Sequence, residues 1–280
     1  MKKQWNQKPD ALWLSVSPHL KGFDQRLLVQ LSSAAVVRRW EYCQSVDEPC
    51  CIDAVVESLH EYLTLRAAKA NGNSLEKRQP IHLMGHGVSG VVGLLYARKY
   101  PQQVASLTLL SVGSQPAVNW QAHYYALRQL LPCRREMILA HMARLLFGEN
   151  PLRFAKALAV LLARDLDSNL TLHSLAHRSK IASGGVDVPL LVCNGAADIV
   201  MNRQPIAWEG HMKLRDRLWN CPDGNHFFHF HHPEATARKI THYWQNLQQI
   251  EQSPEHQNIL SLTEHSSSEN NIVFLPSSTP

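Results

Sequence analysis

Strand-like apolar runs alternate along this chain with longer segments of helical spacing, and this alternation restricts the fold more than any other feature. The strand-like runs are residues 11–17, 35–42, 80–86, 104–113, 188–196 and 216–224, and the main helical segments are 23–33, 51–70, 88–100 and 233–250. Apolar strands that alternate with helices are typical of a parallel sheet covered on both faces. Because crossovers between parallel strands are right-handed, the sequence predicts an α/β fold with a doubly wound, mainly parallel sheet of about six strands.

One region, residues 114–187, interrupts the alternation and contains no strand-like run. Its two long stretches, "HYYALRQLLPCRREMILAHMARLLFG" and "NPLRFAKALAVLLARDL", have helical spacing and are rich in Leu, Ala and Met. We interpret this region as a helical lid over the carboxyl edge of the sheet, inserted between the core segments 11–113 and 188–250. Its basic side chains either favour an acidic ligand or a membrane surface, or form a solvated helix face; they are Arg128, Arg134, Arg135, Arg144, Arg153 and Lys156.

The two ends of the chain lie outside this pattern. Residues 1–10 form an N-terminal arm, and the segment 251–280 is polar and rich in Ser and Pro. Such a composition buries too little apolar surface to offset the entropy of ordering, so we expect a disordered tail.

Charge and composition argue against several classes of partner. The formal net charge is +5 over 280 residues, and the cations are spread rather than clustered, so we expect no binding to nucleic acid. No apolar run approaches the length of about 18 residues that a membrane span needs, and the first ten residues lack the apolar segment of a signal peptide. The six cysteines match no zinc spacing. We therefore expect a cytoplasmic protein with free thiols.

Three strand ends carry residues suited to chemistry. They are "GHGVSG" at 85–90, "GAAD" at 195–198 and "GNHF" at 224–227. Ligands of open α/β sheets bind at the carboxyl ends of the strands, so these segments are the candidate site.

In chain order, the three segments resemble the nucleophile, acid and base regions of the α/β-hydrolase superfamily. "IHLMGHGVSGVVGLLYARKYPQQVASLTLLSVG" resembles the segment around the nucleophile elbow, which reads Gly-His-Ser-x-Gly-Gly in many members; "PLLVCNGAADIV" resembles the strand with the acid, and "GNHFFHFHHPEATARKITHYW" resembles the base and the final helix. The resemblance covers about residues 11–250. It implies the α/β-hydrolase fold of the serine ester-hydrolase type, with Asp198 as the acid that orients His226, the base.

The nucleophile position departs from the family pattern. Alignment of the Gly-His pair places Gly87 where the family has Ser, and Ser89 where it has the small residue that lets helix and strand pack closely. Glycine has no side chain that can attack a carbonyl. Ser89 is the alternative nucleophile, but it would lie about 3 Å farther along the helix axis, and its other interpretation is a hydroxyl that caps a backbone amide.

The resemblance also implies an oxyanion pocket made of backbone N–H groups. The segment after the first strand reads Ser15-Val16-Ser17-Pro18 where many members have His-Gly. Ser17 and Val88 are the expected donors, since Pro18 has no N–H group.

No cofactor and no metal site are expected. The histidines of "HFFHFHHP" (226–233), namely His229, His231 and His232, lack carboxylate or cysteine partners at a known ligand spacing. We interpret this stretch as a turn that leads into a helix with Pro233 at its first position. "GHGVSG" matches neither a Walker loop nor a dinucleotide fingerprint.

Four functions stay open at this point. We expect a hydrolase-like pocket for a small-molecule ligand or substrate, apolar or with an acyl or ester group, that keeps the Asp198–His226 pair but has impaired serine catalysis because of Gly87. The alternatives are an active serine esterase that uses Ser89, and a non-catalytic binder of ligands or partners. A fourth possibility, proton transfer by the Asp–His pair alone, needs no serine.

Overall fold

The computed structural model describes residues 8–44, 51–71, 79–115, 118–149, 152–168, 181–201 and 204–251. The chain divides into two compact units, Met1–Ile240 and Thr241–Pro280. Everything below on packing and on the site concerns the first unit. The predicted N-terminal arm lies almost wholly outside the described residues, and so does all of the predicted tail after residue 251.

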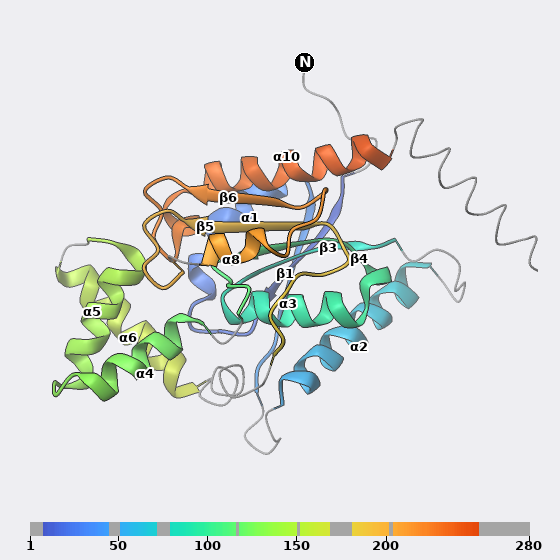
Figure 1. Ribbon diagram of the computed structural model, residues 1–280. Helices are drawn as coiled ribbons and strands as arrows, with labels where there is room; N and C mark the ends of the chain where they lie inside the picture. Colours follow the sequence, from blue (N-terminus) through green and yellow to red (C-terminus); the bar gives the residue numbers. More distant parts are fainter. Residues whose placement is uncertain are drawn as a thin grey trace, which may run out of the picture. The chain divides into compact units, whose positions relative to one another are not determined.

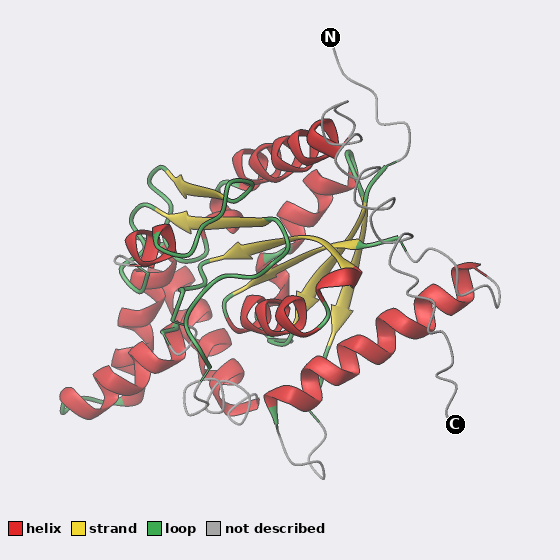
Figure 2. Cartoon of the chain, turned by 45° about the vertical axis from the view of Figure 1, so that its right-hand side comes forward, coloured by secondary structure: helices red, strands yellow, loops and turns green. Residues whose placement is uncertain are grey.

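Six parallel strands form one sheet in the order β2-β1-β3-β4-β5-β6, which confirms the predicted α/β class (Figure 2). The strands are β1 (Asp10–Ser15), β2 (Val36–Glu41), β3 (Ile81–His86), β4 (Val104–Leu110), β5 (Leu190–Gly195) and β6 (Arg217–Cys221). Each strand lies within one of the six predicted runs, or extends one residue beyond it.

Alternate side chains of the strands enter two different helix layers. Leu12 and Leu14 of β1 belong to a buried apolar cluster shared with helices α2 (Ile52–Asn71) and α3 (Val88–Lys99). These two helices lie side by side along the sheet (Figure 1). Trp13, between the two leucines, faces the other way, and its ring centroid lies 5.9 Å from that of His229 in α9 (Phe228–His231). Helix α1 (Gln25–Ser32) contacts α9 and β2 on that second side.

The order of the strands creates a crevice between β1 and β3. The chain pairs β2 with one edge of β1 and then crosses to place β3 on the other edge. The connections after β1 and β3 therefore leave the sheet on opposite sides, and the space between such diverging connections is where α/β sheets bind ligands.

The backbone at the start of helix α3 packs directly against the backbone of β3. A Cβ atom added to Gly90 would lie 2.5 Å from Cγ2 of Val112 and 2.8 Å from the carbonyl oxygen of Gly85. A side chain larger than hydrogen therefore has no room at Gly90. A Cβ atom added to Gly85 would likewise lie 2.7 Å from the backbone carbonyl carbon of Ser89, so Ser89 belongs to the same close approach.

Among the described residues between β4 and β5, where the sequence predicts a helical insertion, there are three helices: α4 (Trp120–Leu130), α5 (Arg135–Phe147) and α6 (Leu152–Ser168). Their apolar faces form a buried cluster with Leu20, Met201 and Phe227, which follow β1, β5 and β6. The three helices thus pack over the carboxyl edge of the sheet (Figure 1). The bounds 114–187 and the function of a lid stay predictions.

The remaining elements are short or terminal. They are the 3-10 turns η1 (Lys21–Phe23) and η2 (Pro101–Gln103), helix α8 (Gln204–Glu209) and helix α10 (Pro233–Glu251). The sequence does not predict α8 or α9, and the stretch interpreted as a turn before Pro233 contains α9 instead. Among the helices that the structure describes, none has the length and apolar character that a bilayer crossing requires.

We expect Gly90→Ala to lower the free energy of unfolding by about 2 kcal/mol or more, because the new methyl group has no room against the backbone of β3. Urea denaturation of the purified variant measures this change. Gly22→Ala is the matched control, since a Cβ atom there meets no atom within 4 Å. Equal stability of the two variants would contradict the close approach.

Acid should weaken the fold through His82. Burial lowers the pKa of this side chain from 6.5 to about 4, and its Nδ1 lies 2.7 Å from Oγ of Ser106 in β4. Between these two pH values the unfolded chain binds a proton that the folded chain does not, so the free energy of unfolding falls as the pH decreases. The limit of this effect is about 3 kcal/mol. In urea titrations at pH 7, 5.5 and 4.5, the free energy of unfolding of His82→Gln should change less with pH than that of the parent. If the two proteins lost the same free energy of unfolding as the pH falls, His82 would not be the group responsible.

Candidate functional site

The turn between β3 and α3 has the backbone geometry of a nucleophile elbow. Gly87 adopts φ 52° and ψ −127°, a region that L-residues enter only under strain. Its N–H donates to the carbonyl of Leu110, and its own carbonyl accepts from Val91, at 3.0 and 3.1 Å. A Cβ atom at position 87 would meet nothing within 4 Å. The turn therefore has free space at position 87, where glycine carries no side chain.

Asp198 and His226 meet at the carboxyl edge of the sheet. Oδ2 of Asp198 lies 2.9 Å from Nδ1 of His226, and both side chains are fully buried. Oδ1 of Asp198 accepts from the N–H groups of Val200 and Met201, at 2.9 and 3.2 Å. Because a carboxylate only accepts hydrogen bonds, the imidazole donates from Nδ1 and presents the lone pair of Nε2.

Nε2 of His226 is buried and has no hydrogen-bond partner among the residues that the structure describes. The loop that carries it is fixed by its own carbonyl, which accepts from Oγ of Ser111 at 2.7 Å and from Nε2 of His86 at 3.1 Å. The three strand ends expected to form the site thus lie close together. The catalytic roles of Asp198 and His226 stay predictions.

Ser89 is bonded elsewhere. Its Oγ accepts from the N–H group of Val16 at 3.0 Å, and the side chain is 6% exposed. The hydroxyl therefore satisfies an amide in the connection after β1 rather than an amide of its own helix, and it does not bond the His226 ring. This hydrogen bond joins the two sides of the crevice.

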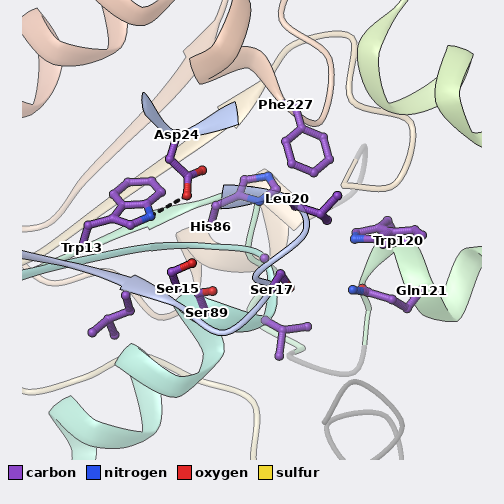
Figure 3. Close-up of a pocket in the computed structure, with 13 residues that line it drawn as sticks. Trp13, Ser15, Ser17, Leu20, Asp24, His86, Ser89, Trp120, Gln121 and Phe227 are labelled. Atoms are coloured by element: carbon purple, nitrogen blue, oxygen red, sulfur yellow. Dashed lines mark hydrogen bonds between the residues drawn. The ribbon is translucent and has the colours of Figure 1, made fainter. Parts of the chain in front are cut away.

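A pocket opens at this crevice, and Gly87, Ser89 and the two predicted oxyanion donors, Ser17 and Val88, line it. Figure 3 shows Trp13 and Asp24 on one side of the pocket, and Trp120 and Gln121 of α4 on the other. The lining mixes aromatic rings with hydroxyl, carboxylate and amide groups.

A second buried histidine–carboxylate pair lies beside the first. Nε2 of His229 is 3.2 Å from Oδ1 of Asp24, and Nε1 of Trp13 donates to Oδ2 of Asp24 at 2.8 Å. The ring of His86 lies between the pairs, with its centroid 4.9 Å from that of His226 and 4.7 Å from that of His229. The sequence does not predict this pair, because an aspartate before a helix is common and Asp24 shows no other signal.

Burial lowers the pKa of two further histidines near the site. Burial, with the neighbouring rings of His229 and His226, holds the pKa of His86 well below its usual range. Burial also lowers the pKa of His123 in α4, and the charges of His141, Asp198 and His226 act on the same group. His123 thus lies near the predicted dyad, although no motif in the sequence marks it.

The histidine-rich stretch 226–233 forms no metal site among the described residues. His229 bonds Asp24, as described above. Within the described part of the chain, no three His, Cys, Asp or Glu side chains are grouped so as to hold a metal ion.

Comparison with known proteins gives close relatives and a shared fold. The chain is 40% identical over 237 residues to the uncharacterized protein alr2406 of Nostoc sp. (strain PCC 7120), which covers 84% of this chain and 90% of the relative. It is 39% identical over 251 residues to the uncharacterized protein sll0249 of Synechocystis sp. (strain PCC 6803), which covers 89% and 96%. No protein-family model matches the chain.

Among solved structures, a putative lipase from Acinetobacter baumannii AYE superimposes with a TM-score of 0.63 at 16% identity, over 86% of this chain and 85% of that one. Serine hydrolases and meta-cleavage product hydrolases are also among the similar structures. At this level of identity the likeness shows the fold, which is that of the α/β-hydrolases.

Ser89→Ala should lower the free energy of unfolding by about 1–2 kcal/mol, because the N–H group of Val16 loses its buried acceptor. Urea denaturation measures the change. Ser33→Ala is the control: that hydroxyl is exposed and bonds only the carbonyl of Gln30 in its own helix end. If both variants kept the parent's stability, the hydrogen bond between Ser89 and Val16 would not stabilise the fold.

Proposed function

This chain is a member of the α/β-hydrolase superfamily, in one family with alr2406 and sll0249, and on that premise we propose that its pocket holds a small acyl- or ester-bearing ligand while ordinary serine hydrolysis is impaired. The observation that carries the proposal is Nε2 of His226, which is buried without a hydrogen-bond partner among the described residues. The His226 ring contacts His86, the residue before the strained Gly87, which has no hydroxyl. Leaving a buried polar atom without a partner destabilises a fold by about 1–3 kcal/mol, so such atoms point to a ligand or a bound water.

The ligand carbonyl fits against the start of α3. Val88 is the first residue of this helix, and the first N–H groups of a helix have no partner within it. They also lie at the positive end of the helix dipole. With the N–H group of Ser17 from the opposite connection, Val88 would stabilise negative charge on the carbonyl oxygen, as an oxyanion pocket does. The apolar part of the ligand would lie on Trp13, Leu20, Trp120 and Phe227, which line the same pocket.

The chemistry open to this arrangement is general-base catalysis. Nε2 of His226 takes a proton from a water molecule as its oxygen bonds to the ligand's carbonyl carbon, and Asp198 stabilises the resulting imidazolium. The tetrahedral intermediate then releases the alcohol, which receives the proton from Nε2. No acyl-enzyme forms, because Gly87 offers no oxygen. The rate should be far below that of a complete triad.

The cytoplasmic location expected from the sequence is also a proposal. Its support is that Cys43, Cys51, Cys133, Cys193 and Cys221, the cysteines within the described residues, are free thiols. Burial raises the pKa of the Cys221 thiol to about 11, so this thiol is unreactive at neutral pH.

Restoring the hydroxyl should restore serine catalysis. We expect Gly87→Ser to hydrolyse p-nitrophenyl butyrate at least ~10²-fold faster than Gly87→Ala in kcat/KM, because the open space at position 87 admits the side chain and Nε2 is ready to activate it. Gly87→Ala is the matched control, since it carries the same backbone strain, about 1–3 kcal/mol, without the oxygen. Labelling by a fluorophosphonate probe should appear only in Gly87→Ser and disappear in Gly87→Ser with His226→Ala.

The parent protein separates the remaining alternatives. Slow ester turnover that His226→Ala abolishes supports the general-base reaction. Binding of the ester without turnover identifies a non-catalytic binder. Labelling of the parent that Ser89→Ala removes would make Ser89 the nucleophile and overturn the proposal, as would a Gly87→Ser variant no more active than Gly87→Ala.

A further inference from the structure

The charges around the pocket indicate which kind of ligand it accepts. Asp24 lines the pocket and is 7% exposed. Among the described residues that line the pocket there is no Lys or Arg, and the lining histidine, His86, is the one whose pKa burial holds well below its usual range. The pocket therefore contains a carboxylate and no fixed positive charge to balance it.

Asp24 lines the pocket and does not cap its own helix. It occupies the N-cap position of α1, where an aspartate commonly accepts a hydrogen bond from the helix backbone, but its side chain makes no capping bond. Its oxygens are held instead by Nε1 of Trp13 and Nε2 of His229. Trp13 is a neutral donor. Nδ1 of His229 is buried and has no hydrogen-bond partner among the described residues.

Gln121 supplies a second acceptor from the opposite wall. This residue, in the first turn of α4, lines the pocket and is 3% exposed. Its Oε1 is buried and has no hydrogen-bond partner within the described part of the chain. Figure 3 shows Gln121 facing the pocket across from Asp24. A buried amide oxygen without a donor is a position that a ligand donor would satisfy.

We propose that Asp24 and Gln121 select a ligand that carries a hydrogen-bond donor, a hydroxyl or an ammonium group, and exclude ligands that carry a carboxylate. This inference rests on one part of the proposed function, namely that this pocket is the ligand site. Burial strengthens both effects, since a carboxylate brought near Asp24 is repelled in a medium of low dielectric constant, whereas an ammonium group is attracted.

Three probes with the same six-carbon chain test the selection: hexylammonium, 1-hexanol and hexanoate, titrated by calorimetry or ligand-observed NMR at pH 7. The parent should bind hexylammonium at least tenfold more tightly than hexanoate, with 1-hexanol between them. Asp24→Asn keeps the shape and an acceptor for Trp13, and it should bring hexylammonium to within about threefold of 1-hexanol. Asp53→Asn is the matched control, because it makes the same change of net charge at an exposed position of α2 and should leave the ratios unchanged.

Gln121→Glu is a second test, which applies even if Asp24→Asn does not fold. It adds a second carboxylate of nearly the same shape and should raise the preference for hexylammonium over hexanoate by a further fivefold or more. Gln121→Leu should weaken 1-hexanol binding at least threefold.

The inference is overturned if the parent binds hexanoate as tightly as hexylammonium, if it binds none of the probes, or if a folded Asp24→Asn keeps the parent's ratios. If Asp24→Asn does not fold, an unchanged ratio in Gln121→Glu overturns it. These titrations measure binding alone, so a Gly87→Ser variant without esterase activity would reject the proposed function and leave this selection standing.

Discussion

The backbone contact between β3 and α3 at Gly85 and Gly90 determines the geometry on which the site depends. A Cβ atom at either position would overlap the opposite backbone, so the helix can start close above the strand only with glycine at both. This close start forces Gly87 to a positive φ, brings the first N–H groups of α3 to the edge of the sheet, and carries Ser89 within reach of Val16 in the neighbouring connection.

Two buried histidine–carboxylate pairs lie at the carboxyl edge of the sheet, and some of their polar atoms have hydrogen-bond partners while others have none among the described residues. Both oxygens of Asp198 accept hydrogen bonds, and Nδ1 of His226 is bonded to one of them, while Nε2 has no partner in the described part of the chain. Asp24 and His229 repeat the arrangement 205 residues apart in sequence. Buried polar atoms without a partner among the described residues, such as Nε2 of His226 and Oε1 of Gln121, are what supports the proposed ligand site at this crevice.

The sequence predicts the sheet well because strand periodicity and helix spacing are local signals, and each of the six runs became a strand. The approach of Asp198 to His226 also follows from sequence, since two neighbouring parallel strands must end at one edge. The Asp24–His229 pair does not follow, because no local pattern shows that the start of α1 and the four-residue helix α9 meet across the same strand. The partner of Ser89 was missed for the same reason: Val16 is 73 residues away.

The free volume at position 87 has a consequence for the shape of the ligand. Where a serine hydrolase places a hydroxymethyl group, this protein leaves space with no atom within 4 Å of the missing Cβ. For the acyl-bearing ligand proposed above, a branched or quaternary carbon next to the carbonyl, which would be crowded against a serine, would fit this space beside the main chain. The proposed site would thus accept bulkier acyl groups than a site with serine at this position.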